Sequence, residues 1–321
     1  MKHFLFSLFL LSITIFVGCS TDTNGIDNTQ SQTEQEIQTV IDDSLDLYFD
    51  GLDDFSEDNF LSDEPNWLSS TSLNKVSETK VRFGRIKTKP VEHRIDIITD
   101  TDSTATAYLY VKFEGNFIAK KYQRDEDTTS ISRYVKPLTH EIERIIHLKK
   151  RTNAEAARRN WRIVDISFAD GQSPINTVQI EELTIMAVGI DTVTITDPLN
   201  YFMNGADMFI LPRFTEVKLQ VKVRNTTSNP VVFPENTEST ESVRLQYGRN
   251  RLGNFARTNF DWISKDGDLN VYEGKWIVRQ FRGLHHAIID VINNGTIFEE
   301  DAETYPYVSN TWATPYRVTI F

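Results

Sequence analysis

Two stretches of the chain alternate strictly between apolar and polar residues, and this pattern restricts what they can form. Within residues 103–122 the apolar positions are Ala105, Ala107, Leu109, Val111 and Phe113, and polar or aromatic residues stand between them. Within residues 217–224 the apolar positions are Val217, Leu219, Val221 and Val223. Successive side chains of a strand point to opposite faces, so a period of two predicts strands with one buried face and one face in water. We therefore expect antiparallel sheets in both halves of the chain.

Near the N-terminus the apolar residues instead recur every three or four positions, from Ile37 to Leu52. This spacing predicts an amphipathic helix from Glu34 to about Gly51. A short second helix and a loop are expected after it, where Phe55, Phe60 and Trp67 lie among acidic residues. Two strands are then predicted over 79–88 and 91–99, and the residues Glu114-Gly115-Asn116 are a predicted hairpin turn.

The order of a long helix followed by several long antiparallel strands over 34–170 resembles the cone-shaped domains of the nuclear transport factor and polyketide-cyclase superfamily. The resemblance implies a curved sheet that wraps the helix around a pocket. The aromatic residues expected to line such a pocket are Phe60, Trp67, Tyr108 and Tyr110, although core packing is an alternative use for them. Enzymes of this superfamily place Asp and His in the pocket. The nearest residues here, His93 and Asp96, are three apart and point to opposite faces of a regular strand.

No helical period persists after residue 175, and many short strands are predicted there. The segment "ADGQSP" at 169–174 is expected to be an inter-domain linker because Gly and Pro interrupt regular structure. Asn294-Gly295 is a two-residue hairpin signal. Residues 175–321 therefore resemble an immunoglobulin-like β-sandwich. The expected fold class is α+β followed by all-β, with a helix and a curved antiparallel sheet in the first domain and a sandwich in the second.

The first residues predict export. A basic start is followed by an apolar run over 4–17 that is too short to cross a bilayer as a helix. The sequence Phe16-Val17-Gly18-Cys19 resembles the lipobox of bacterial lipoproteins, with Phe where Leu is usual. This resemblance implies cleavage after residue 18 and attachment of fatty acyl chains, such as palmitate, to Cys19. Ser20 after the cysteine implies outer-membrane sorting within the cell envelope.

The acidic residues are concentrated before residue 75. Residues 20–74 hold 14 Asp and Glu and no Lys or Arg, whereas 32 acidic and 33 basic residues follow. Residues 19–33 are predicted to be a flexible acidic stalk, because they hold too little apolar surface to offset ordering. The balanced charge beyond the stalk gives no basis for nucleic-acid binding.

No catalytic residues and no cofactor are predicted, because motifs of the common nucleophile, phosphate-loop, dinucleotide and zinc classes are missing from the sequence. His140 and His147 are seven residues apart and cannot readily share one zinc ion. The adjacent His285 and His286 should point to opposite faces, with one packed and one exposed. "DGDLN" from Asp266 begins like a calcium-binding EF-hand loop but has Val271 where Gly is required. We therefore expect neither a tight calcium site nor a zinc site there or at the acidic run 299–303.

Three functions remain open at this point. The first is a membrane-anchored binding or envelope-assembly module, whose partners are the membrane and either envelope proteins or a small apolar ligand. The second is an enzyme that acts on a small apolar ligand in the pocket of the 34–170 domain. The third is a structural spacer in an envelope complex. The sequence favours the first because it predicts an anchor and a stalk but shows no chemistry.

Overall fold

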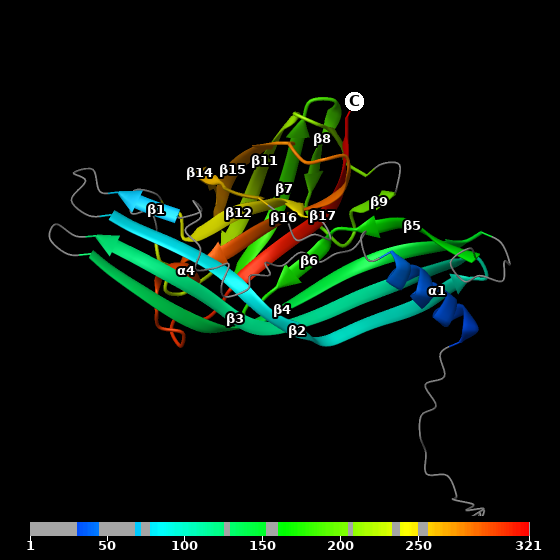
Figure 1. The fold of residues 1–321 in the computed structure, drawn as a ribbon, viewed down its shortest axis with the longest axis horizontal. Helices are drawn as coiled ribbons and strands as arrows, with labels where there is room; N and C mark the ends of the chain where they lie inside the picture. Colours follow the sequence, from blue (N-terminus) through cyan, green and yellow to red (C-terminus); the bar gives the residue numbers. More distant parts are fainter. Residues whose placement is uncertain are drawn as a thin grey trace, which may run out of the picture.

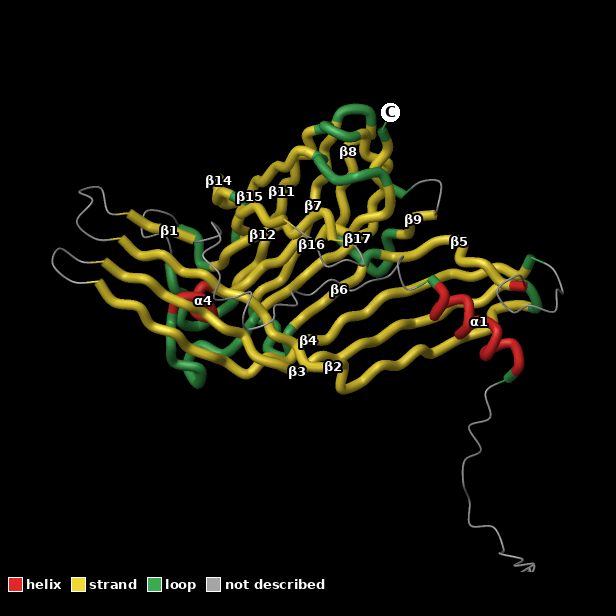
Figure 2. Tube along the Cα trace, in the orientation of Figure 1, coloured by secondary structure: helices red, strands yellow, loops and turns green. Residues whose placement is uncertain are grey.

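The protein is described here by a computed structural model that covers residues 31–44, 68–71, 78–124, 129–151, 160–204, 208–232, 238–249 and 256–320. Within these ranges the chain is mostly β. It forms a curled, largely antiparallel sheet of 12 strands and a second sheet of 5 strands, and α-helices are few (Figures 1 and 2). A helix-first unit followed by an all-β unit describes this arrangement only loosely, because the larger sheet contains strands from both halves of the chain.

Three long strands cross the width of the molecule and form one side of it (Figure 1). They are β2 (Glu78–Thr101), β3 (Thr104–Arg124) and β4 (Thr129–Lys150), and the short β1 (Leu68–Thr71) pairs with β2 at the edge. The predicted alternation in β3 is confirmed. Ala105, Ala107 and Leu109 are buried on the inner face, whereas Tyr108 lies on the outer face and is 43% exposed.

Two predictions about these strands are wrong. The expected strands over 79–88 and 91–99 form one strand, with irregular register on both sides of Pro90. The expected hairpin at Glu114–Asn116 is also missing, because β3 continues through it. Gly115 pairs with Lys87 on one side and Leu138 on the other, so the sheet satisfies a backbone that locally favours a turn.

The inner face of the long strands is covered in three places along its length. At one end it packs against α1 (Gln32–Asp43), and at the other against α4 (Asn294–Phe298) and Tyr307. In the middle, Phe113 and Ile142 pack against the C-terminal half of the chain. The outer face keeps its polar and aromatic side chains in solvent over most of its length.

Helix α1 starts at a capping box formed by Ser31 and Glu34. The side chain of Ser31 accepts a hydrogen bond from the backbone N–H of Glu34, and Glu34 bonds back to the backbone of Ser31. Ile37 and Ile41 are fully buried against β3, β4 and β5 (Trp161–Ser167). Each such side chain contributes roughly 1.5–3 kcal/mol of stability. The rest of the predicted helix, beyond Ser44, and the predicted second helix lie outside the described residues.

The second sheet has the order β14 (Asp261–Asp266), β15 (Leu269–Ile277), β11 (Glu216–Asn225), β7 (Val178–Ala187) and β8 (Ile190–Ile195). It stacks on the part of the larger sheet formed by β12 (Glu241–Arg249), β16 (Gly283–Asn293) and β17 (Ser309–Thr319) (Figure 1). The apolar faces of both sheets form the largest core, and the buried valines predicted for β11 belong to it. The remaining short strands of the larger sheet are β9 (Phe202–Asn204), β10 (Ile210–Pro212) and β13 (Ala256–Asn259).

Residues 169–172 are a strand and not a linker, so that prediction is wrong. They form β6 (Ala169–Gln172), which pairs with β4 on one side and β17 on the other. The packing there is tight, because a Cβ atom on Gly171 would lie 2.3 Å from the Thr311 hydroxyl. The hairpin predicted at Asn294-Gly295 is wrong as well. Asn293 caps α4 by accepting a hydrogen bond from the N–H of Gly295, which starts a helical turn.

Candidate functional site

The residues predicted to line a pocket do not come together among the described residues. Tyr108 and Tyr110 lie on the outer face of β3, and the guanidinium carbon of Arg94 lies 5.1 Å from the centre of the Tyr110 ring. Phe60, Trp67 and the lipidation candidate Cys19 lie outside the described residues. His93 pairs with Val111 of β3 and Asp96 with Tyr108, so the two side chains point to opposite faces as expected.

The two histidine pairs are also separated. His140 is buried on the inner face of β4, whereas His147 lies on its outer face, where its Nδ1 is 2.7 Å from Asp165. His285 and His286 occupy successive positions of β16 and point to opposite faces. Both are buried, so the expectation that one would be exposed is wrong.

The acidic loops are engaged in other contacts. Asp266 and Asp268 form ion pairs with Lys222 and Arg224, and the amide of Asn270 donates a hydrogen bond to the carboxylate of Glu241. In the run 299–303, Asp301 accepts hydrogen bonds from backbone N–H groups of its own turn. The described residues contain no group of three His, Cys, Asp or Glu side chains that could hold a metal ion.

A buried polar network joins the two halves of the chain. The two terminal nitrogens of Arg85 in β2 each donate a 2.7 Å hydrogen bond to the carboxylate of Asp290 in β16, and its Nε donates to the hydroxyl of Tyr307. His140 Nδ1 lies 3.1 Å from the same hydroxyl. Burial on its own would raise the pKa of Asp290, but the charges of Arg85 and Arg244 overcome it and hold that pKa below its ordinary value.

This network contains the residue types of an active site, but its side chains are buried away from solvent. Arg85, Asp290, His140 and Tyr307 are each at most 5% exposed, so water and substrate do not reach them in this state. A general acid or base must come within hydrogen-bond reach of a bound substrate. We therefore assign the network a structural role, as the clamp that holds β2 and β4 against β16 and β17.

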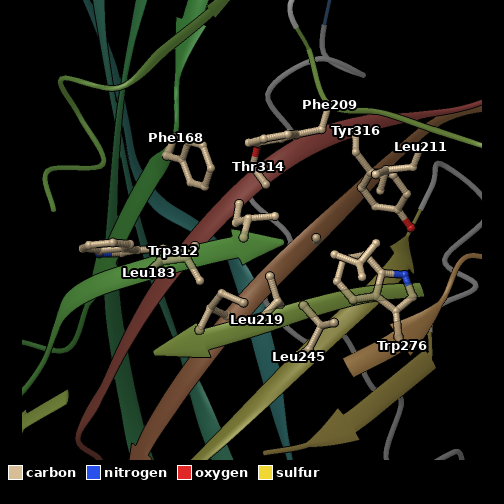
Figure 3. Close-up of a pocket in the computed structure, with 14 residues that line it drawn as sticks. Phe168, Leu183, Phe209, Leu211, Leu219, Leu245, Trp276, Trp312, Thr314 and Tyr316 are labelled. Carbon is tan, nitrogen blue, oxygen red and sulfur yellow. The ribbon is translucent and has the colours of Figure 1, made fainter. Parts of the chain in front are cut away.

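A small cavity lies inside the largest core, between the two sheets (Figure 3). Side chains of both sheets point into it, among them Leu219 and Trp276 from one sheet and Trp312 and Thr314 from the other. The cavity has a volume of about 30 Å³, and its walls are almost wholly apolar. This volume holds one or two waters at most, and a cavity with apolar walls favours staying empty. The space is a packing defect and not a pocket of ligand size.

The most unusual exposed feature is an aromatic and basic surface beside the C-terminal end of β17. Phe214 follows β10, Phe281 lies in the loop between β15 and β16, and they are 68% and 80% exposed. The guanidinium carbon of Arg213 lies 4.9 Å from the Phe214 ring centre and 5.6 Å from the Phe281 ring centre. We call Phe214, Phe281 and the exposed arginines Arg213, Arg279, Arg282 and Arg317 the Phe–Arg surface.

The backbone holds this surface in a defined shape. Phe214 has a φ of 69°, in the left-handed region, where a bulky side chain is an outlier. Its N–H donates to the carbonyl of Val278 at 2.7 Å, and the N–H of Arg213 donates to Thr319 at 2.9 Å. These bonds join the end of β10 to the ends of β15 and β17. Strained conformations of this kind persist only where the surroundings impose them, and they are concentrated at functional sites.

The loop that carries Phe281 is also fixed. The carbonyl oxygen of Phe281 lies 2.7 Å from Nε2 of the buried His285. The ring of His285 packs in a tilted orientation against the ring of Tyr316. Strand β15 ends at Ile277, and the chain leaves the sheet before Phe281. The sequence signal of the surface is a phenylalanine close to arginine, with one arginine in "PRF" and two in "RQFR".

The charge of the surface differs from that of the whole chain, which has a formal net charge of −12. It carries four exposed arginines, and the carboxylate of Glu216, three residues after Arg213, lies 3.8 Å from the ammonium group of Lys275. Exposed aliphatic residues in the same strand ends widen the apolar area; these are Ile210, Ile277 and Ile320. A surface that combines apolar projections with positive charge can hold an apolar partner that carries negative charge.

Searches with this chain against protein-family models, curated proteins and solved structures return no match. In the part of the chain that the structure describes, no helix combines the length and the apolar composition needed to span a membrane.

Proposed function

We propose that the protein is an exported lipoprotein, anchored in the cell envelope through Cys19, and that it works as a binding or envelope-assembly module. The anchor rests on the resemblance of residues 16–19 to a lipobox, and the observation that carries the binding role is the Phe–Arg surface. Two phenylalanines project into solvent although burial would favour both, and one of them, Phe214, has a strained backbone conformation. Exposed phenylalanines do not stabilise a monomer, so we assign the Phe–Arg surface to the binding of a partner.

We also propose that the chain consists of a cone-like unit and an immunoglobulin-like sandwich. Packing of α1 against β3, β4 and β5 supports a cone-like unit in the first half of the chain. The core between the two stacked sheets supports an immunoglobulin-like sandwich in the second half.

The alternative functions have less support. An enzyme in the 34–170 domain needs a cavity with ionisable groups around it, but the described candidates Tyr108 and Tyr110 lie on an outer face. A structural spacer needs length, which β2, β3 and β4 supply, but it needs no protruding aromatic residues. A spacer function therefore leaves the Phe–Arg surface unexplained.

The anchor is tested by replacing Cys19 with Ser in cells. We expect the protein to leave the detergent phase and to stay unprocessed or soluble. An unmodified Cys19 thiol in the mature native protein would contradict the anchor.

The docking role is tested by placing a photo-crosslinking residue at position 281 or, as a control, at position 131 in cells. Ile131 is 62% exposed on the outer face of β4, so the two positions are matched in exposure and apolar character. We expect crosslinked products of any kind to form mainly at position 281. Equal yields at the two positions would show that the Phe–Arg surface has no special role.

A further inference from the structure

We propose that the Phe–Arg surface binds an anionic phospholipid bilayer, with Phe214 and Phe281 in the apolar region and the arginines at the phosphate groups. This inference rests on the proposed docking function and names the partner of the same surface. It adds a second membrane contact, on the folded part of the chain, to the lipid anchor at Cys19.

The shape of the surface favours a lipid phase over a folded partner. Phe214 and Phe281 project from two turns, and the exposed fraction of each ring is large, so they do not line a groove. A projecting side chain needs either a matching pocket or a soft medium that closes around it. The headgroup region of a bilayer is such a medium, and aromatic side chains flanked by basic residues bind there.

The distribution of charge supports the same partner. Arg279 and Arg282 flank Phe281, and Arg213 lies between the two rings. Arg317 pairs with Ile210 across β10 and β17, and both are exposed. Phosphate groups accept hydrogen bonds from guanidinium groups in a bidentate manner, so a layer of lipid phosphates offers each arginine a partner. The net negative charge of the chain lies before residue 75, and the remainder is nearly neutral, which limits repulsion between this part and anionic lipid.

The neighbouring sheet edge disfavours a partner that adds a strand. Strand β10 has three residues, and its last residue is Pro212, which has no N–H to donate. Short strands and proline at an edge prevent pairing with another chain. The part of this region that the structure describes is therefore suited to side-chain contact and not to backbone pairing.

The location agrees with a contact made by the folded body. Figure 1 shows the C-terminal end of β17 at the top of the view, on the side of the sandwich away from β2, β3 and β4. The backbone hydrogen bonds from Arg213 to Thr319 and from Phe214 to Val278 fix the turn that carries Phe214 relative to both sheets, and the carbonyl of Phe281 is held at the buried His285. Membrane contact here would set the orientation of the whole body, which a flexible stalk alone cannot do.

The test is flotation with lipid vesicles, using a chain that starts at Ser20. This chain keeps every described residue but has neither the signal nor the cysteine. We expect it to float with vesicles rich in phosphatidylglycerol about tenfold or more strongly than with phosphatidylcholine alone, and high salt should remove the difference. Phe214→Ala with Phe281→Ala should abolish flotation, and Arg213→Ala with Arg317→Ala should reduce the preference for phosphatidylglycerol. Ile131→Ala, which removes an exposed apolar side chain elsewhere, should change nothing.

Circular dichroism and thermal melting of each variant establish that it is folded. Absence of flotation with phosphatidylglycerol, or equal flotation by the double phenylalanine variant, overturns the lipid inference. If flotation fails while position 281 still forms crosslinks to one protein in cells, the docking function stands and its partner is a protein. If both fail, the docking function is wrong as well.

Discussion

At the scale of single residues, the pair Arg85–Asp290 stands out because a charged pair is completely buried between strands that are 205 positions apart in sequence. Burying two charges costs free energy, which is offset by their bidentate geometry, by the hydrogen bond that Arg85 donates to the Tyr307 hydroxyl and by the one that Ser309 donates to Asp290. Such a pair contributes little net stability but makes any other packing of the two halves costly. The sequence could not reveal it, because nothing local marks Arg85 as different from the exposed Arg94 on the same strand.

Removing the charge of Asp290 should be strongly destabilising. Asp290→Asn leaves Arg85 buried without its countercharge, and we expect the free energy of unfolding to fall by about 3–5 kcal/mol. The control is Asp96→Asn, which breaks the exposed ion pair with Arg94 on the outer face and should cost less than about 1 kcal/mol. Denaturant unfolding of the chain from Ser20 measures both. Similar losses for the two variants would show that the buried network does not clamp the halves together.

Asp170 in β6 should make stability depend on pH in the opposite sense to most acids. Burial raises its pKa to about 6, and the charge of Glu143 raises it too, although the amide of Asn310 partly opposes this. The folded state therefore binds this proton more tightly than the unfolded state. Its contribution is fully present below the ordinary pKa of 3.8 and is lost as the pH rises through about 6.

Asp170→Asn keeps the shape of the side chain and removes this dependence. We expect the variant to gain stability over the parent as the pH rises from about 4 to about 7, by up to about 3 kcal/mol. Denaturation midpoints of both proteins across this range measure the gain. A difference between the two that stays constant with pH would contradict the raised pKa.

At the scale of elements, local signals predicted strands better than turns. The alternation in β3 and β11 correctly predicted both the strand and its buried face. The turn signals at Gly115 and at Asn294-Gly295 failed, because neighbouring strands pair with one and a helical turn forms at the other. Residues 169–172 look like a linker by composition, but β4 and β17 lie on both sides and complete the hydrogen bonds of that strand.

The turn at Phe214 offers a test of strain at the level of an element. Gly adopts a φ of 69° without a Cβ clash, which costs other residues about 1–2 kcal/mol, although its greater freedom when unfolded offsets part of this gain. We expect Phe214→Gly to leave the free energy of unfolding unchanged or to raise it by up to about 1 kcal/mol. The same variant should lose vesicle binding.

Ile131→Gly is the matched control for this change, because Ile131 is equally exposed but lies in the regular strand β4. Gly in a strand interior lowers stability, so this variant should unfold more easily. If Phe214→Gly destabilises the protein as much as Ile131→Gly, the turn at Phe214 stores no strain and the argument for a functional conformation weakens.

At the scale of the whole molecule, the two predicted units share one sheet, which runs from β2 through β6 to β13. Pairing between the halves is long-range, and short periodic patterns carry no information about it. The motifs "PRF" and "RQFR" are visible in the sequence, but their meeting in one Phe–Arg surface could not be predicted, since only the fold brings residues near 213, 281 and 317 together. The candidate anchor, by contrast, depends on a local motif and stays a prediction from sequence.

The most direct measurement of the central claim is the depth of the Phe–Arg surface in a bilayer. Cys19 is the only cysteine, so the chain from Ser20 has no thiol, and a spin label can be attached to a single Cys placed at Arg282 or at Ile131. Collision with oxygen dissolved in the apolar phase and with a water-soluble nickel complex then reports depth for each label on vesicles rich in phosphatidylglycerol. We predict that the label at 282 is shielded from nickel and reached by oxygen, while the label at 131 stays in water. A label at 282 that stays as accessible to nickel as the one at 131 would contradict the account.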